Sequence, residues 1–497
     1  MAQYEPKREW ASQWLAETKK PYIGGAFVEG HGPVMDSINP ATGEVIGHFQ
    51  TCTKEDVDLA VAAARKAFDE GPWTHEISHR DRRVIMQKIA DLLRDNIEEL
   101  ATLETLDNGK TFTESCEDIT NVAEFFDYYA GWTDKFYGEV NPVMGDFFSY
   151  TVREPMGVCG QIVPWNYPMD MAGYKLAPAL ALRNTIVFKP SSHTSFSMIR
   201  TAEILQESGL LPEGVFNVVL GPGSVGGFIT KHPDVDKAAF TGSTEVGRSL
   251  VHDSADSNLK HLSLELGGKS PNIIFEDAPD LDWAIERSFV AMFSGKGEKC
   301  SEPTRLLVQR SVYDKVVAGL IDYAEKNWKV GDPFDPETTQ GAQVSKAQFD
   351  RIMNYIEIGK AEGAKLLLGG TRNTEGDNAK GYFIDPTIFE CTNDMRIAQE
   401  EIFGPVLCVI PFDTEEEAIN IANDTTYGLG AGFWTNDVAR TQRVANALQA
   451  GQVFINKYGC YEHTSPFGGY KQSGWGMECG DLSLDLYTRR KSIWYAY

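Results

Sequence analysis

The sequence has no long apolar segment. Nowhere in its 497 residues do 18 apolar residues run together, and the first 15 contain no apolar core of signal-peptide length. The first absence excludes an apolar transmembrane helix. Together they favour a cytoplasmic protein without a membrane anchor.

Cysteine is scarce. Eight cysteines are too few for a disulfide framework in a chain of this length, and no two of them form a CxxC pair. Without that pair the usual structural zinc and thioredoxin-like sites are not expected, and we predict no metal site. A functional cysteine in this chain would therefore act alone, as a thiolate.

Positive charge is also in deficit. The chain has 46 Lys and Arg against 71 Asp and Glu, which gives a net charge of −25. Such a protein lacks the electrostatic attraction that nucleic acids and anionic membrane surfaces require, so neither is expected as a partner. Hydrophobic residues at 42% are enough for several buried cores. The length suggests about three domains, or two with a long insertion.

The pattern of the chain changes near residue 150. Before it, apolar residues at helical spacing predict helices, and one such stripe stops at Asn108-Gly109. After it, strands are predicted over 158–164, 184–190, 215–221 and 237–242, and helices over 171–182 (interrupted at Pro178), 195–209 and 243–255. This alternation predicts a parallel, doubly wound sheet with ligands at the carboxyl ends of its strands. A second alternation after residues 262–275 predicts a second α/β domain.

The C-terminal segment, YTRRKSIWYAY, is aromatic and β-prone, and no partner strand is close to it in sequence. It is either a strand in a sheet of its own chain or an exposed edge that pairs with a neighbouring subunit. We favour the second interpretation.

Two glycine-rich turns follow predicted strands. Residues 221–226 have the form GxGxxG, and residues 242–247 have the form GxxxxG and open a helix. Either turn could present backbone N–H groups to a pyrophosphate, although ordinary turn chemistry explains each equally well. The first turn lacks an acidic residue that closes a strand about 20 residues further on and could bind a ribose. The second turn has the better strand–turn–helix context.

Cys300 follows a predicted amphipathic helix, in the segment SGKGEKCS. Glycines allow a backbone to approach a ligand closely, and Lys296 and Lys299 are expected to lower the pKa of the thiol. The alternative is a small buried hydrophobe, which is the usual role of a lone cysteine.

Three other residues are candidates for chemistry. Glu265 lies between two leucines, where burial would raise its pKa towards that of a general base, unless it pairs with Lys269. Asn166 in PWNYP is a side-chain donor suited to an oxyanion, unless it forms an Asx-turn. Lys189 closes a strand and could bind ribose hydroxyls or phosphate, or be a solvated strand end.

These motifs occur in a fixed order: PWNYP, FKPSS, FTGSTEVG, LELGGKSPN, GEKCS, EEIFGPV and PFGGYKQSG. The sequence resembles the aldehyde dehydrogenase superfamily of NAD(P)-dependent, non-acylating enzymes from about residue 20 to its end. The resemblance implies an α/β fold with a Rossmann-type cofactor domain (1–135 and 157–267) and an α/β catalytic domain (268–478). It also implies a β-flap and a homodimer or homotetramer, with oligomerisation segments at 136–156 and 479–497.

The resemblance further implies oxidation of an aldehyde to a carboxylic acid with NAD or NADP. Cys300 would attack the aldehyde, and the Asn166 amide and the backbone N–H of Cys300 would hold the oxyanion of the thiohemiacetal. After hydride transfer, water activated by Glu265 would hydrolyse the thioester.

By the same resemblance, the 242–247 turn would border the pyrophosphate, and Lys189 would bind the adenine-side ribose. Glu401 and Phe403 would hold the nicotinamide-side ribose and ring. Ser192 stands where NAD-preferring relatives commonly have Glu, and Ser does not repel a 2′-phosphate, so NADP is also expected to fit. The full set implied for the cofactor is Val163, Trp165, Lys189, Ser192, Gly223, Gly242, Ser243, Gly247, Leu266, Glu401 and Phe403.

The sequence departs from the family pattern in the substrate tunnel. Asp170 and Glu462 could attract an amino- or betaine-type aldehyde, although Lys299 argues the other way. Alternatively, Asp170 pairs with a neighbouring Lys and the tunnel takes ordinary aliphatic or aromatic aldehydes. Beside Lys299, Glu298 replaces the usual Gln. The residues expected to line the tunnel are Asp170, Tyr167, Tyr174, Tyr461 and Phe467.

A different class of enzyme is the alternative function. A non-redox thiol hydrolase or acyltransferase would use Cys300 with a basic partner such as His261 or His463. The sequence has no recognisable triad signature for it.

Overall fold

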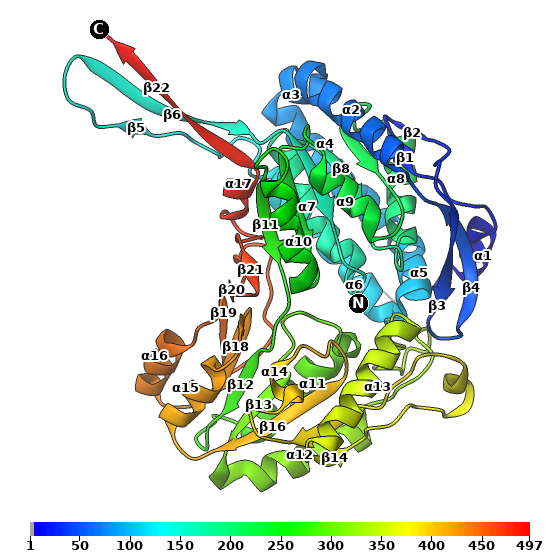
Figure 1. Ribbon diagram of the computed structural model, residues 1–497, viewed down its shortest axis with the longest axis vertical. Coiled ribbons are helices and arrows are strands. Elements are labelled where there is room, and N and C mark those ends of the chain that lie inside the picture. Colours follow the sequence, from blue (N-terminus) through cyan, green and yellow to red (C-terminus); the bar gives the residue numbers. More distant parts are fainter. Residues whose placement is uncertain (1–3) are drawn as a thin grey trace.

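Two mainly parallel sheets organise the chain. In the computed structural model, which describes residues 4–497, an eight-stranded sheet has the order β2-β1-β9-β8-β7-β10-β11-β21 (Figure 1). Its strands are β1 (Tyr22–Ile23), β2 (Ala26–Phe27), β7 (Val158–Ile162), β8 (Thr185–Lys189), β9 (Phe216–Val218), β10 (Lys237–Thr241), β11 (His261–Glu265) and β21 (Gly474–Trp475). The central strands β9-β8-β7-β10-β11 are all parallel, as the strand–helix alternation predicts.

Helices cover both faces of this sheet. In β8, Ile186 and Phe188 pack into one hydrophobic core while Val187 packs into another, because successive side chains of a strand point to opposite faces. A strand buried on both faces reads as a continuous apolar run, which is how this segment appears in the sequence. One face carries α2 (Lys54–Glu70), α9 (Gly223–Lys231) and α10 (Thr244–Ala255), and the other α4 (His79–Asp95), α5 (Ile97–Asn108), α6 (Phe112–Ala130), α7 (Pro168–Ala181) and α8 (Phe196–Ser208).

The second sheet has seven strands in the order β14-β15-β16-β13-β12-β18-β19. They are β12 (Pro271–Ile274), β13 (Arg305–Gln309), β14 (Lys365–Leu368), β15 (Thr387–Glu390), β16 (Val406–Phe412), β18 (Gly430–Trp434) and β19 (Gln452–Ile455). The helices packed with it are α11 (Leu281–Phe293), α12 (Tyr313–Asn327), α13 (Lys346–Ala361), α14 (Arg396–Gln399), α15 (Glu415–Asn423) and α16 (Val438–Ala447). The predicted second α/β unit is therefore present.

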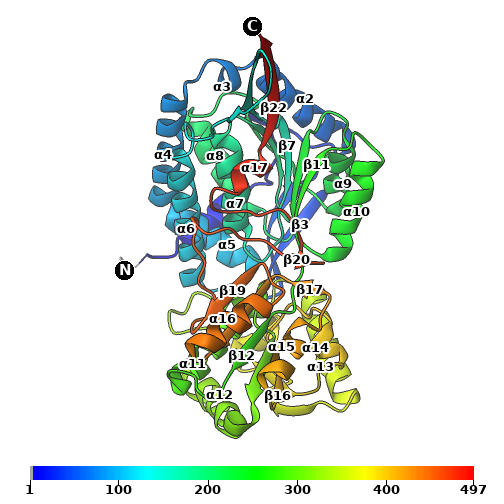
Figure 2. The same ribbon diagram turned by 90° about the vertical axis from the view of Figure 1, so that its left-hand side faces the viewer.

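A narrow β-arm projects from the body, with the C-terminus at its tip (Figures 1 and 2). It consists of β5 (Val140–Asn141), β6 (Phe147–Pro155) and β22 (Thr488–Ala496) in the order β22-β6-β5. β22 pairs antiparallel with β6 along its whole length, so the C-terminal segment is a strand of a sheet in its own chain. Our preference for a neighbouring subunit as its first partner is wrong. Its partner strand is distant in sequence, so no local pattern could identify it.

Helix α7 corrects a second expectation. It runs through Pro178 to Ala181, whereas the sequence predicts an interruption at the proline. The C=O of Pro178 accepts a hydrogen bond from the N–H of Leu182 at 3.2 Å, so the last turn is preserved. All residues of the helix except the half-buried Asp170 and Met171 are buried, and this packing offsets the roughly 3 kcal/mol that an interior proline costs.

The carboxyl ends of the first sheet's parallel strands face the second sheet. The turns after β7, β8, β10 and β11 carry PWNYP, KPSS, GSTEVG and Leu266, so these motifs share one edge of the sheet. β21, which lies within the segment predicted for the catalytic domain, pairs with β11 in the first sheet. The domain limits stay a prediction. Within residues 4–497, no helix has both the length and the apolar character that a membrane span needs.

Candidate functional site

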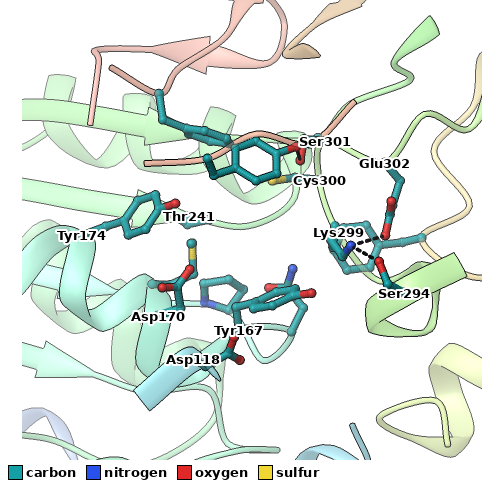
Figure 3. Close-up of a pocket in the computed structure, with 18 of the residues that line it drawn as sticks. Asp118, Tyr167, Asp170, Tyr174, Thr241, Ser294, Lys299, Cys300, Ser301 and Glu302 are labelled. Atoms are coloured by element: carbon teal, nitrogen blue, oxygen red, sulfur yellow. Dashed lines mark hydrogen bonds and ion pairs between the residues drawn. The ribbon is translucent and has the colours of Figure 1, made fainter. Parts of the chain in front are cut away.

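A cavity of about 530 Å³ lies where the carboxyl edge of the first sheet meets α11 and the loops of the second unit (Figure 3). Helices α6 and α7 form one of its walls. The predicted site residues that line it are Trp165, Asn166, Tyr167, Asp170, Tyr174, Gly242, Ser243, Leu266, Cys300, Glu401, Phe403, Tyr461 and Phe467. Segments far apart in sequence are thus brought to one chamber.

The other predicted residues do not line this chamber. Gly247 has a packing role, because a Cβ there would lie 2.6 Å from a methyl carbon of Leu266. Val163 is buried, and its N–H donates to the C=O of Lys189 at 3.2 Å. Ser192 and Gly223 lie just after β8 and at the start of α9, respectively.

Cys300 follows a tightly wound loop. Gly295, Lys296 and Gly297 all have φ near +60° to +70°, and Gly297 allows close packing because a Cβ there would lie 2.4 Å from the carbonyl carbon of Gly404. The loop therefore touches the segment that carries Glu401 and Phe403.

The thiol of Cys300 sits in a low-dielectric, acidic environment. Burial raises its pKa well above the ordinary value, and the carboxyl groups of Glu265 and Glu401 raise it further. The expectation that Lys296 and Lys299 lower this pKa is wrong. Both ammonium groups are directed to other partners.

Lys299 is directed away from the thiol. Its Nζ donates to Ser294 Oγ at 2.7 Å and lies 3.4 Å from Glu302 Oε1, as the dashed lines in Figure 3 show. Burial raises the pKa of Glu302, and Lys299 opposes that shift. Glu302 was not singled out from the sequence, although its position two residues after Cys300 was an available signal.

Asn166 lies next to the thiol loop. It is 7% exposed, and its Nδ2 donates to the C=O of Glu298, two residues before Cys300, at 2.8 Å. Its Oδ1 has no hydrogen-bond partner among residues 4–497, so the side chain does not form the alternative Asx-turn. Asn108 holds the preceding turn, because its Nδ2 donates to the C=O of Trp165 at 2.6 Å.

Glu265 ends β11 beside the cavity with its carboxyl group 2% exposed. Neither oxygen has a hydrogen-bond partner among the described residues, and Lys269 Nζ is likewise unpaired, so the alternative Glu265–Lys269 pair does not form. Burial raises the pKa of Glu265, Glu478 raises it further and Lys175 opposes the shift. Lys175 Nζ itself pairs with Glu478 Oε1 at 2.5 Å.

The predicted cofactor residues have free polar capacity suited to a dinucleotide. Lys189 is 4% exposed, burial lowers its pKa to about 8, and its Nζ donates to the C=O of Pro190 at 3.1 Å. An ammonium group has three donors, which leaves capacity for ribose hydroxyls. Ser243 caps α10, and no atom lies within 4 Å of a Cβ built on Gly223. This open turn admits a ligand.

The nicotinamide end of the predicted site also has free capacity. Glu401 Oε1 accepts the N–H of Gly268 at 2.9 Å, which leaves Oε2 free of that contact. The rings of Trp165 and Phe403 meet edge to face with their centroids 5.3 Å apart. These groups fit a ribose and an aromatic ring. Ser192 contributes no carboxylate that would repel a 2′-phosphate.

The tunnel wall formed by α6 and α7 is acidic. Lys110, buried beneath Tyr167, pairs with Glu104 and Asp118, while Asp170 has no ion pair within 4 Å among residues 4–497. The alternative in which Asp170 pairs with a neighbouring Lys is therefore not observed. Asp118 also lines the cavity. It was not predicted from the sequence, because nothing distinguishes it from the other acidic residues of its helix.

The two histidines considered as partners for a hydrolytic thiol lie in different places. His261 begins β11, at the opposite end of the strand from Glu265. His463 lines the cavity, but its Nδ1 faces Glu462 at 3.7 Å and its ring packs on Tyr128 with centroids 5.2 Å apart. In the described part of the chain, neither forms a hydrogen bond with Cys300.

Known structures first identify the class of protein. The NAD+ complex of aldehyde dehydrogenase from Bacillus cereus is 46% identical, covers 99% of this chain and 99% of its own, and superposes with a TM-score of 0.95. The doubly wound fold with an attached α/β unit is thus that of a dehydrogenase.

Sequence comparison then identifies the family. The model of the aldehyde dehydrogenase family matches residues 27–493. An aldehyde dehydrogenase of Emericella nidulans is 47% identical over 477 residues, 95% of this chain and 94% of its own. The human mitochondrial aldehyde dehydrogenase is 48% identical over 462 residues, 92% of this chain and 88% of its own. The chain belongs to the aldehyde dehydrogenase family.

Membership confirms several predictions. The chain is an NAD(P)-dependent oxidoreductase that oxidises aldehydes, and its fold class is the predicted one. The non-redox thiol hydrolase is not supported.

The environment of Cys300 predicts its reactivity without cofactor. Because burial and neighbouring carboxyl groups raise its pKa, iodoacetamide at pH 7 should modify it at least about tenfold more slowly than the exposed Cys460. The ratio of the two modification rates should become smaller at alkaline pH, where the Cys300 thiol also loses its proton. Peptide mass spectrometry over time measures both rates in the same sample. Faster labelling of Cys300 at pH 7 would contradict this reading of the site.

Proposed function

We propose that Cys300 is the nucleophile, Glu265 the general base and Asn166 the oxyanion donor of this aldehyde oxidation. The observation that carries the proposal is the convergence of three groups: the half-buried Cys300, the buried Glu265 carboxyl group whose charge acts on its thiol, and the buried Asn166 amide beside its loop. Perturbed groups gathered at a cavity are typical of active sites.

Each of these groups has a defined task. The Glu265 carboxylate, unpaired and desolvated, takes the proton of the thiol, whose own pKa is raised. Cys300 Sγ then bonds to the aldehyde carbon, and the Asn166 Nδ2–H and the backbone N–H of Cys300 stabilise the oxygen as it gains negative charge. When bound, the dinucleotide supplies the hydride acceptor.

Release of the acid again uses Glu265. After the proton taken from the thiol has passed to solvent, the Glu265 carboxylate removes a proton from a water molecule that adds to the Cys300 thioester, and the carbon–sulfur bond then breaks to return the thiolate. The raised pKa of Glu265 suits it to both proton transfers.

Two substitutions test these roles. Cys300→Ala should reduce aldehyde-dependent NAD(P)H formation by at least about 10⁴-fold, because no covalent intermediate can form. Glu265→Gln should lower steady-state turnover about 10²- to 10⁴-fold, with at most a burst of reduced cofactor before it, because hydrolysis lacks its base. Stopped-flow absorbance at 340 nm distinguishes burst from steady state.

The matched controls are Cys460→Ala and Glu357→Gln, which alter an exposed thiol and an exposed ion pair. Both should keep full turnover. If Cys300→Ala also kept it, the proposed mechanism would fail.

We further propose that the tunnel prefers an aldehyde with a positively charged distal group. Asp170 lines the cavity without an ion pair, whereas the cation that argued against this preference, Lys299, is paired with Glu302. The ring of Tyr174, on the same helix as Asp170, adds an aromatic wall.

The charge of Asp170 depends on pH. Burial raises its pKa to about 7, Glu104 raises it and Lys110 lowers it. Above pH 7 the side chain is therefore mainly an anion, and below pH 7 it is mainly neutral. A permanently charged substrate would be bound better as the pH rises.

Betaine aldehyde and its neutral isostere 3,3-dimethylbutanal test this preference. The ratio of their kcat/KM values should rise about tenfold between pH 6 and pH 8, and Asp170→Asn should lower the ratio at pH 8 to its pH 6 level. The exposed Asp350→Asn is the control. A ratio independent of both pH and Asp170 would exclude the cationic preference.

We also propose that the protein is a homodimer or homotetramer assembled through the β-arm. The arm has free edges on both outer strands and exposes Trp494 (60%) and Tyr495 (62%), which favours contact with a second copy. The cytoplasmic location stays a prediction from the sequence.

A chain that ends at Tyr487 tests the arm. Tyr487 is fully buried and remains, so the body should keep its fold while the oligomer dissociates. Sedimentation velocity measures the change, with Trp283→Asp, an exposed tryptophan on α11, as the control. If the sedimentation coefficient changed only by the amount that the lost mass explains, β22 would not be part of the interface.

A further inference from the structure

Two charged residues of the loop that leads to Cys300 form a buried ion pair. Lys296 Nζ and Glu298 Oε2 are 2.9 Å apart, and each residue is 1% exposed. The proposed mechanism uses neither side chain. A buried pair is costly to break, because the remaining charge has no compensation.

Lys296 adopts a conformation that a lysine rarely takes. Its φ is +65°, between two glycines that also have positive φ. For an L-residue with a side chain this conformation is unfavourable, so the surroundings must hold it. Gln343 Nε2 donates to its C=O at 3.3 Å, and Gly295 N–H donates to Glu114 Oε1 at 2.7 Å.

The ammonium group of Lys296 ties the loop to the turn that carries Asn166. It donates to the backbone oxygen of Asn108 at 2.8 Å and to Asn108 Oδ1 at 2.9 Å. The Nδ2 of Asn108 in turn donates to the C=O of Trp165 at 2.6 Å. Lys296 is thus two hydrogen bonds from the backbone next to Asn166.

Glu298 completes a closed circuit. Its Oε1 accepts the N–H of Val344 at 3.2 Å, and its C=O accepts Asn166 Nδ2 at 2.8 Å. The circuit therefore runs from Lys296 through Asn108 to the 165–166 turn, through the Asn166 amide to Glu298, and back to Lys296.

We propose that the Lys296–Glu298 pair positions the proposed oxyanion donor Asn166 against Cys300 by holding residues 295–297 of the loop in their left-handed conformation. Both are positioning residues. The proposal rests on the roles proposed for Asn166 and Cys300. Loss of one charge leaves the other buried without compensation. Loss of both removes that penalty but also removes the hydrogen bonds from Lys296 to Asn108, so the double variant should still be impaired.

The charges around the pair define the effect of pH. Burial lowers the pKa of Lys296, and Glu298 and Glu114 oppose this while Lys110 reinforces it. Burial raises the pKa of Glu298, and Lys296 and Lys110 oppose this. Without Glu298 as its partner, Lys296 would lose its proton as the pH rises. Without Lys296, Glu298 would gain a proton as the pH falls.

The two single variants should therefore have opposite pH profiles. In Glu298→Gln, kcat should fall at least about tenfold at pH 7 and recover towards the wild-type value as the pH rises. In Lys296→Met, kcat should fall similarly but recover only partly as the pH falls, because the hydrogen bonds to Asn108 stay absent. KM for the cofactor should change less than about threefold in both, because the pair does not line the proposed dinucleotide site.

The double variant Lys296→Met/Glu298→Gln is the decisive measurement. It buries no uncompensated charge, so its pH profile should be parallel to the wild-type one. It still lacks the hydrogen bonds from Lys296 to Asn108, so its kcat should stay at least about tenfold below the wild-type value. Asp350→Asn, which breaks an exposed ion pair, is the control and should change nothing. Single variants with wild-type profiles, or a double variant with wild-type kcat, would overturn the proposal.

If a single variant does not fold, Glu298→Asp gives the same test. It keeps the charge but withdraws the carboxylate by one methylene, so kcat should fall several-fold without a change in the shape of the pH profile. Wild-type kcat for Glu298→Asp would overturn the proposal. Iodoacetamide labelling of Cys300 in the same variants reports on the loop independently of turnover. If Cys300→Ala stayed active, the proposed function would fail, whatever the labelling shows.

Discussion

The contact between the 294–300 loop and the turn after β7 is the constraint on which the site depends. It joins the two halves of the molecule through one short hydrogen bond, from Asn166 Nδ2 to the C=O of Glu298 at 2.8 Å. Gly297 makes the approach possible, since any side chain there would collide with Gly404. Both sheets serve to bring these two segments together in a place that excludes water, where a fixed donor acts more strongly than it would in solvent.

Some buried charges are paired and others are not. Three buried lysines have a carboxylate partner: Lys110 with Glu104 and Asp118, Lys175 with Glu478, and Lys296 with Glu298. Other buried cations, such as Lys237 and Lys269, have none within the described residues. The carboxyl groups of Glu265 and Asp170 have no cationic partner either, and desolvation without a partner raises their pKa values. Both lie at the cavity or beside it, and the roles proposed for them rest on that position together with the lack of a partner.

The net charge of −25 is a property of the whole chain, whereas binding at the site depends on the charges close to it. A global excess of acid does not prevent an anionic cofactor from binding, because Lys189 and the N-terminus of α10 provide local donors at the carboxyl edge of the sheet. Nor does global acidity determine the preference for a substrate. The preference proposed above follows instead from Asp170 in the tunnel and from the pairing of Lys299 with Glu302.

The sequence by itself determined the alternation of strands and helices, the end of a helix at Gly109, the turn that opens α10 and the order of motifs that identifies the family. These features depend on local periodicity and on residues close together along the chain. It also indicated Cys300, Glu265 and Asn166 as candidates, because their motifs are short and continuous. The direction in which the pKa of Cys300 shifts, the partners of Lys296 and Lys299, the strand that pairs with β22 and the place of Asp118 in the cavity were decided only by tertiary structure. Each of these depends on which distant segments pack together and on how much water they exclude. Neighbours along the chain do not fix either quantity.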